Sequence, residues 1–174
     1  GVVIATGSAT RRLPGQEDVP TVYELRTLED SLALRERIAD GTARVVVVGA
    51  GFIGLEVAAT ARARGCAVTV LEGLPSPLIR GLGADMGAAA TAVHAADGID
   101  IRCGVRGEGL GADGGALAGG EVGPADVIGV GIGVAPGARW LGGSGLNGRG
   151  RVLCGDTLPG AARRRGGGVV CRWA

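Results

Sequence analysis

The sequence contains no lysine, one histidine and very few aromatic residues. All 18 residues that are cationic at neutral pH are arginines, and aromatic side chains make up 2 % of the chain. The net charge is only +1, which gives no basic surface to attract nucleic acid. So few rings also provide no platform on which bases stack. We therefore expect no nucleic-acid partner.

Cysteines are few and widely spaced. Cys66, Cys103, Cys154 and Cys171 include no Cys-x-x-Cys pair, which argues against a metal site or a redox dithiol. We interpret them as reduced thiols of a cytoplasmic protein. No signal peptide and no apolar run long enough to span a membrane are recognisable, so we expect no membrane partner.

Glycine, in contrast, is abundant at 36 of 174 residues, and three glycines follow the most apolar stretch. Four consecutive valines at 45–48 predict a buried central strand of a parallel sheet. Gly49, Gly51 and Gly54 come next as Gly-x-Gly-x-x-Gly and lead into a helical pattern. A second predicted strand, at 67–72, ends in an acid. This order is typical of a dinucleotide-binding unit.

Each part of this pattern has a physical role. Gly49 permits a tight turn, Gly51 lets a pyrophosphate approach the backbone, and Gly54 lets the helix pack closely on the strand. Free N–H groups in the first turn of the helix attract phosphate charge. Glu72 lies near the spacing expected for the acid that binds an adenosine ribose. Because an acid repels a 2′-phosphate, we expect NAD rather than NADP.

The remaining pattern predicts an α/β fold, a Rossmann-like parallel sheet with a small β-meander. Thr27 and Asp30 resemble a capping box at the start of a helix. The predicted apolar face of that helix consists of Leu28, Leu32, Leu34, Ile38 and Ala39. A further helix is expected at 84–96, and strands at 99–103 and 125–134. The meander is placed at 104–123, with its best hairpin turn at 112–115.

Five separated segments carry a family resemblance: 1–8 (GVVIATGS), 25–30 (LRTLED), 49–58 (GAGFIGLEVA), 124–126 (PAD) and 130–136 (VGIGVAP). Their residues and order resemble the FAD-dependent ferredoxin and rubredoxin reductases of the pyridine nucleotide-disulfide oxidoreductase superfamily. The resemblance covers residues 1 to about 158. It implies that a hydride passes from NADH to FAD, and that electrons pass on to a ferredoxin or rubredoxin. No catalytic side chain is implied, because the two cofactors carry the redox chemistry.

The resemblance also implies which residues contact the cofactors. Those near FAD are Thr6, Gly7 and Arg26. The NAD pyrophosphate is assigned to Gly49, Gly51, Phe52, Ile53 and Gly54. The nicotinamide is bordered by Glu56, Gly131, Ile132 and Gly133. The adenosine end is assigned to Glu72 and Arg80. Simpler interpretations stay open for three of these residues: a solvated helix acid for Glu56, a surface cation for Arg26, and a loop salt bridge for Arg80.

This interpretation predicts three regions. Residues 1–23 are predicted to be a crossover strand and connector from an FAD domain, and that FAD domain is missing from this sequence. Residues 24–137 are predicted to be the NAD-binding domain. The family's Ala-x-Gly-Asp stretch is absent near the end, where Arg163 to Gly168 stand instead. We therefore interpret 138–174 as a partial, degenerate return to the FAD domain, and the whole chain as part of a longer protein.

Three alternatives remain at this stage. One is another flavoenzyme of the superfamily, such as a nitrite reductase subunit or an apoptosis-inducing-factor-like protein. Another is a non-catalytic NAD-binding module. The third is a non-functional gene fragment, which the irregular sequence of the last residues would fit.

Overall fold

The chain divides into two compact units, which are described separately. One unit is Thr10–Gly133, and the other combines Gly1–Ala9 with Val134–Ala174. The computed structural model describes residues 2–105, 109–110, 116–117, 124–148, 151–154, 159–160, 164–166 and 171–173. The turn predicted at 112–115 lies outside these residues, as do Arg163, Gly167 and Gly168.

The larger unit is built on a five-stranded sheet in which every strand runs parallel to its neighbours. In spatial order the strands are β3 (Val22–Tyr23), β9 (Val127–Val130), β4 (Arg44–Val48), β5 (Ala67–Glu72) and β6 (Asp100–Cys103). The α/β Rossmann-like class is therefore confirmed. Since β3 belongs to the sheet, the unit extends further toward the N-terminus than residue 24, where the sequence analysis placed its start.

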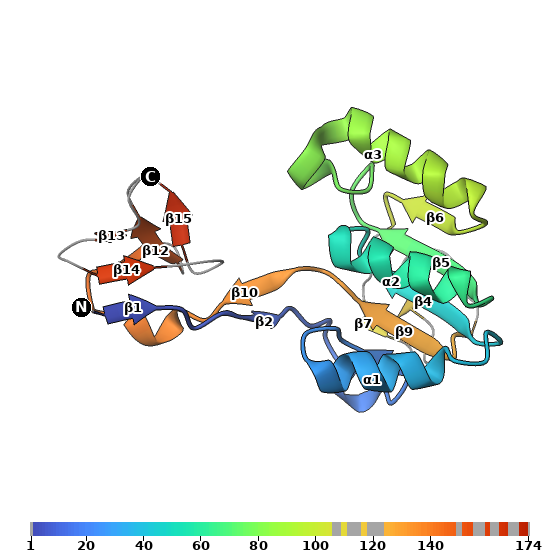
Figure 1. The fold of residues 1–174 in the computed structure, drawn as a ribbon, viewed down its shortest axis with the longest axis horizontal. Helices are drawn as coiled ribbons and strands as arrows, with labels where there is room; N and C mark the ends of the chain where they lie inside the picture. The colour runs from blue at the N-terminus through green and yellow to red at the C-terminus, as the bar shows by residue number, and fades with distance from the viewer. Residues whose placement is uncertain are drawn as a thin grey trace. The chain divides into compact units, whose positions relative to one another are not determined.

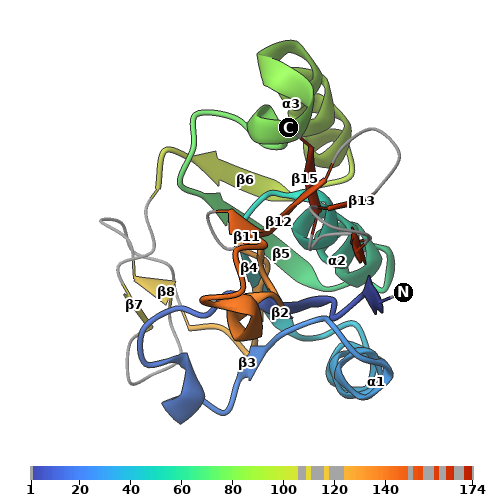
Figure 2. The ribbon, with the colours of Figure 1, turned by 90° about the vertical axis from the view of Figure 1, so that its left-hand side faces the viewer.

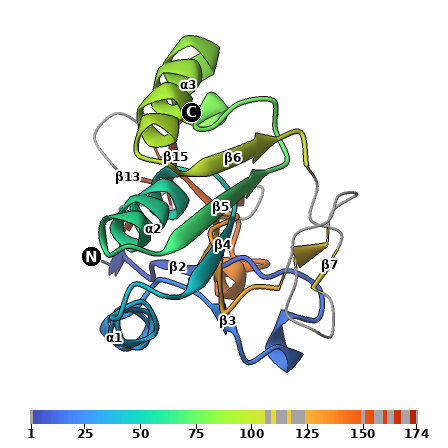
Figure 3. The ribbon, with the colours of Figure 1, turned by 90° about the vertical axis from the view of Figure 1, so that its right-hand side faces the viewer.

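Three helices cover one face of this sheet: α1 (Leu28–Arg37), α2 (Phe52–Ala63) and α3 (Ile79–Ala96). Figures 2 and 3 view the molecule from opposite sides, and both place the helices on the same face. The antiparallel pair of β7 (Gly109–Leu110) and β8 (Ala116–Leu117) lies on the other face (Figure 3). This pair is the described part of the predicted meander.

The four valines of β4 supply both faces of the core. Val45 and Val47 pack with helix residues such as Leu55 and Ala58, whereas Val46 and Val48 pack with Leu13 and others on the opposite face. This division follows from the alternation of side chains along a strand. All four valines are at most 5 % exposed. Burying each one stabilises the fold by about 1.5–3 kcal/mol.

Helix α1 begins with the predicted capping box. Thr27 Oγ1 accepts a hydrogen bond from the Asp30 N–H at 3.2 Å, and the Asp30 carboxylate accepts one from the Thr27 N–H at 2.8 Å. The predicted apolar face is only partly correct. Leu34 and Ile38 are buried, but Leu28 is 67 % exposed and Leu32 is 43 % exposed. Positions 34 and 38 share the face toward the sheet because they are one helical turn apart.

The smaller unit has short strands around its own core (Figure 1). Its three-stranded sheets are β1 (Val2–Ile4), β14 (Arg164–Gly166) and β13 (Pro159–Gly160), and then β11 (Asn147–Gly148), β12 (Arg151–Cys154) and β15 (Cys171–Trp173). The core residues are Ile4, Ala138, Leu141, Leu146, Val152 and Cys154. Strands β2 (Ser8–Thr10) and β10 (Val134–Pro136) form a separate two-stranded sheet. Two short 3-10 helices complete the described elements, η1 (Gln16–Asp18) and η2 (Arg139–Leu141).

We predict that Gly54→Ala destabilises the fold without any cofactor present. A Cβ at Gly54 would lie well inside van der Waals contact with the carbonyl oxygen of Gly49, and forced overpacking of this kind costs about 1–3 kcal/mol. Gly51→Ala is the matched control, because a Cβ there meets no atom within 4 Å. Urea unfolding should place the control within about 0.5 kcal/mol of wild type. Equal stabilities for the two variants would contradict the packing argument.

A second prediction concerns the Arg44–Asp126 pair, which links the starts of β4 and β9. Arg44 Nε and Nη2 each approach the Asp126 carboxylate at 2.8 Å, and the Arg44 N–H donates to it at 2.9 Å. The Arg44 side-chain hydrogen bond, followed by the backbone one, holds the Asp126 pKa far below its usual range. Stability from this group is therefore present above the unfolded pKa, about 4, and is lost as pH falls through the folded pKa. Asp126→Asn should be less stable than wild type at pH 7, with the gap closing in acid. A pH-independent difference in thermal unfolding would exclude this linkage.

Candidate functional site

The candidate site is a cleft at the carboxyl ends of β4, β5 and β9. It has a volume of about 560 Å³ and is lined by residues 13, 48–52, 71–74, 76, 78–81, 105 and 131–133. The chain order β4, β5, β6 proceeds to one side of β4, whereas β9 pairs with its other side. The connections therefore diverge between β4 and β9, which is where open parallel sheets place ligands.

The turn after β4 forms the floor of the cleft. Gly49 has a φ of 102°, a left-handed conformation that favours glycine. Its N–H donates to the Leu71 carbonyl at 2.8 Å, and the Gly131 N–H donates to the Val48 carbonyl at 2.8 Å. A Cβ at Gly49 would stand 2.5 Å from the Gly131 carbonyl oxygen. The turns after β4 and β9 therefore touch through their backbones.

Gly51 differs from the other two glycines of the motif. Its φ of −79° is accessible to any residue, and a Cβ there would meet no atom within 4 Å. Neither backbone strain nor a protein neighbour accounts for a glycine at this point. The space above Gly51 is open and lies at the N-cap of α2, so the position suits a ligand that must approach the backbone.

The first turn of α2 faces the same space. Gly51 offers no side-chain cap, and the Leu55 N–H makes the first intrahelical bond, to the Gly51 carbonyl at 3.0 Å. The amides of Phe52, Ile53 and Gly54 precede that bond, so helix geometry leaves them without an intrahelical acceptor. Together with the helix dipole, these donors favour a bound anion. The open backbone and the donor set fit the pyrophosphate of a dinucleotide.

Glu72 lies at the end of β5 and lines the same cleft. Its Oε2 accepts a hydrogen bond from the Ala50 N–H at 2.7 Å, and its Oε1 accepts one from the Leu74 N–H at 2.9 Å. A carboxylate has about four lone-pair sites, so both oxygens retain capacity for ribose hydroxyls. Arg80 is exposed in the first turn of α3 and lines the same cleft.

One expected strand is a turn. The sequence analysis placed Gly131, Ile132 and Gly133 in a strand at 125–134, but β9 ends at Val130 and β10 begins at Val134. Gly133 has a φ of 101°, which is incompatible with a strand, and its carbonyl accepts a hydrogen bond from the Arg11 N–H at 2.9 Å. The three residues nevertheless line the cleft beside Gly49.

Several predicted site residues lie away from this cleft. Ile53 and Gly54 are not among the residues that line the cleft; they line a separate small cavity with Val47 and Val57, and Ile53 is 43 % exposed. Glu56 is exposed and lines a groove between α1 and α2. Arg26 is exposed just before α1. Thr6 and Gly7 belong to the smaller unit, where Thr6 Oγ1 donates to the Gly137 carbonyl at 2.5 Å and the Gly137 N–H donates to the Gly7 carbonyl at 2.8 Å.

Sequence reasoning missed several residues of the cleft, among them Leu13, Ala50 and Leu78. Leu13 is buried in the core beneath the cleft, and its N–H donates to Gln16 Oε1 at 2.7 Å. The Leu78 N–H donates to the Ala50 carbonyl at 3.1 Å. The only available signal was the loop 74–78, rich in proline, which indicates a fixed turn without showing what it contacts.

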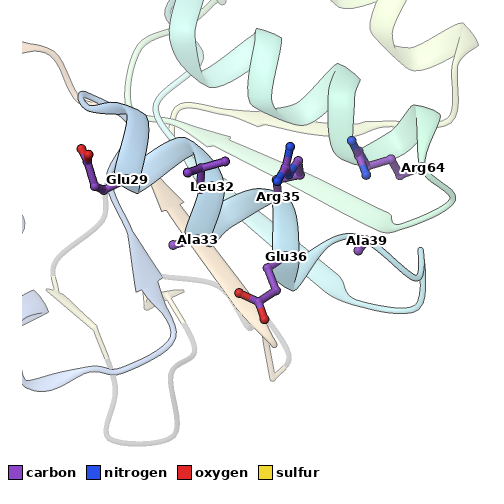
Figure 4. Close-up of a pocket in the computed structure, with 7 residues that line it drawn as sticks. All are labelled: Glu29, Leu32, Ala33, Arg35, Glu36, Ala39 and Arg64. Carbon is purple, nitrogen blue, oxygen red and sulfur yellow. The ribbon is translucent and has the colours of Figure 1, made fainter.

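A second depression lies between α1 and the C-terminal end of α2 (Figure 4). It is lined by Glu29, Leu32, Ala33, Arg35, Glu36, Ala39 and Arg64. Arg64 caps the end of α2 opposite the glycine turn. Glu36, Ala39 and Arg64 lie at or near the C-terminal ends of α1 and α2, where a helix presents carbonyl groups and the negative end of its dipole, which do not favour an anion.

In the described part of the chain, no three histidine, cysteine, aspartate or glutamate side chains are grouped so that they would hold a metal ion. None of the helices in this part has the length and apolar character needed to cross a membrane.

Comparisons with known proteins agree with this geometry. The chain is 42 % identical over 137 residues to the ferredoxin–NAD(+) reductase component of the p-cumate 2,3-dioxygenase system of Pseudomonas putida, covering 78 % of this chain and 34 % of that protein. It is 38 % identical over 141 residues to rhodocoxin reductase of Rhodococcus erythropolis, covering 78 % of this chain and 33 % of that one. The crystal structure of the ferredoxin reductase for the CYP199A2 system of Rhodopseudomonas palustris superposes with a TM-score of 0.88 at 34 % identity, covering 98 % of this chain and 44 % of that one.

The chain thus spans about a third of the length of the curated relatives that it matches. The model of the pyridine nucleotide-disulphide oxidoreductase family matches residues 1–159 of the 174. The chain therefore belongs to the pyridine nucleotide-disulphide oxidoreductase family.

Proposed function

We propose that this chain is the NADH-binding part of an FAD-dependent reductase that passes electrons to a ferredoxin or rubredoxin. The observation that carries the proposal is the open backbone at Gly51. That position is free of protein atoms and of backbone strain, and it lies at the N-terminus of α2. A pyrophosphate placed there meets amide donors and the positive end of the helix dipole.

In this proposal the cleft binds NADH in an extended form. The pyrophosphate lies over the glycine turn and the first turn of α2, formed by Gly49, Gly51, Phe52, Ile53 and Gly54. The adenosine ribose contacts Glu72, and Arg80 approaches the adenosine end. The nicotinamide lies beside the turn 131–133. Phe52 is 58 % exposed at the edge of the cleft, and its ring offers apolar surface to the bound cofactor.

The flavin part of the proposal rests on the family and on the names of relatives. Its FAD contacts are Thr6, Gly7 and Arg26, with Glu56 near both rings, and these roles come from the resemblance. When both cofactors are bound, they supply a hydride transfer from the nicotinamide to the flavin. This chain's own residues bind and orient the dinucleotide, and the FAD domain of the same protein is their proposed partner.

Two narrower points belong to the same proposal. NADH is favoured over NADPH because the Glu72 carboxylate lies where a 2′-phosphate would be repelled. A cytoplasmic location is supported by Cys66, Cys103 and Cys154, which form no disulfide within the described residues, as is usual in a reducing compartment.

The direct test is Gly51→Val. A valine side chain would occupy the space proposed for the pyrophosphate, so we expect NADH affinity to fall at least about 100-fold, about 2.7 kcal/mol. Isothermal titration of the purified chain measures this loss. Thermal unfolding without NADH is the control and should change little, because the space holds no protein atom. NADH binding that survives the substitution would refute the proposed pyrophosphate position.

Cofactor selectivity tests the proposed role of Glu72. In Glu72→Arg an attractive cation replaces a repulsive anion near the 2′-position, so the ratio of NADH to NADPH affinity should fall about tenfold or more. The substitution also removes the hydrogen bond from Ala50 to Glu72, which should weaken the binding of both cofactors. The ratio of the NADH and NADPH affinities is therefore the readout, and not either affinity alone. Glu36→Arg, the same charge change on α1, should leave the ratio unchanged. If Glu72→Arg also leaves the ratio unchanged, the ribose assignment fails.

A further inference from the structure

Ala50, the residue between the first two motif glycines, has both of its backbone polar groups engaged. Its N–H donates to Glu72 Oε2 at 2.7 Å, and its carbonyl accepts from the Leu78 N–H at 3.1 Å. Ala50 itself is completely buried. Its methyl side chain makes no polar contact, so the orientation of this peptide is determined by the loop that follows β5.

That loop is in turn held by β6. The Val105 N–H donates to the Glu72 carbonyl, and the Gly104 N–H donates to the Leu74 carbonyl, both at 3.0 Å. The Leu74 N–H donates to Glu72 Oε1 at 2.9 Å. Glu72 therefore projects from a main chain that is fixed on both sides, and its carboxylate joins two loops.

Leu78 adds an independent sign that this contact is enforced. It has a φ of 53°, and it is the one residue other than glycine with positive φ in the described part of the chain. A leucine in the left-handed region is unfavourable and persists only where surrounding contacts impose it. Its N–H in that conformation reaches the Ala50 carbonyl.

We propose that Glu72 is a positioning residue for the glycine turn in addition to its role at the ribose. It fixes the Ala50 peptide before any cofactor binds, so that the pyrophosphate meets a turn already in its binding geometry. The inference rests on the proposed function for what the turn binds, but the positioning itself is a property of the cofactor-free protein. A turn held in advance loses less entropy when the ligand binds.

Both roles are compatible in one side chain. Each Glu72 oxygen accepts one backbone hydrogen bond and has a further lone pair available. Ribose hydroxyls are therefore added to the existing bonds and do not replace them. A glutamine has a single acceptor oxygen and an NH₂ group in place of the other, so it satisfies only one of the two amides.

The test is amide hydrogen exchange measured by NMR on the full chain without cofactor. In Glu72→Gln, exchange at the Ala50 or Leu74 amide should accelerate roughly tenfold or more, as expected when a charge-assisted hydrogen bond is lost. The Gly49 amide is the internal reference, because it donates to the Leu71 carbonyl and not to Glu72. Glu36→Gln makes the same chemical change on the exposed face of α1 and should leave all three amides unchanged.

Unchanged exchange at both Ala50 and Leu74, or equal acceleration at Gly49, overturns the positioning role. If Glu72→Gln does not fold, Glu72→Asp replaces it, because aspartate keeps the charge but has a side chain shorter by one methylene. Exchange at the Ala50 and Leu74 amides of that variant is again compared with exchange at the Gly49 amide. Selective acceleration in that variant supports the proposal, and its absence refutes it. An NADH titration of wild type separately tests the proposed function, so failure of one is distinguishable from failure of the other.

Discussion

The close approach of three backbone segments determines the rest of the larger unit. The turn at Gly49 lies against Gly131, which follows β9. Gly54, in the first turn of α2, lies against the carbonyl group of Gly49. Side chains at Gly49 and Gly54 would separate these segments. With the side chains absent, the carboxyl ends of two parallel strands and the amino end of a helix meet at one point. The backbone donors and the helix dipole therefore point into the same cleft.

The glycine turn carries only the small methyl side chain of Ala50, and the neighbouring loop supplies the hydrogen bonds that fix its orientation. Glu72 and Leu78 contact the N–H and the carbonyl of Ala50 from the β5–α3 connection. Gly87 allows α3 to pack onto the same connection, because a Cβ there would collide with Ser76 and Pro77. The second strand, its loop and α3 thus support the cradle formed by the first strand and α2.

Local patterns in the sequence were sufficient to predict the central βαβ unit. Four β-branched residues, the glycine spacing and the terminal acid each act within a few residues. β4 begins one residue before the predicted valine strand, and β5 has the predicted bounds of 67–72. Other features depend on contacts distant in sequence. Glu72 bonds Ala50 only because β4 and β5 pair in a particular register. The apolar residues at 125–134 predicted one buried strand, but β9 ends at Val130 and Gly133 has a φ that no strand adopts. Leu28 and Leu32 were assigned to the buried face of α1, but Leu34 and Ile38 are the residues of that helix that pack in the core.

The contrast between the two depressions of this unit shows why hollow shape alone does not identify a site. Both have apolar walls, and the one between α1 and α2 carries two arginines, Arg35 and Arg64. Those cations are on exposed flexible side chains in water, where a single ion pair contributes little. At the glycine turn the donors are backbone amides whose positions are fixed by the fold, so no side-chain entropy is lost when an anion binds. A fixed array of weak dipoles therefore makes a better phosphate site than two mobile full charges.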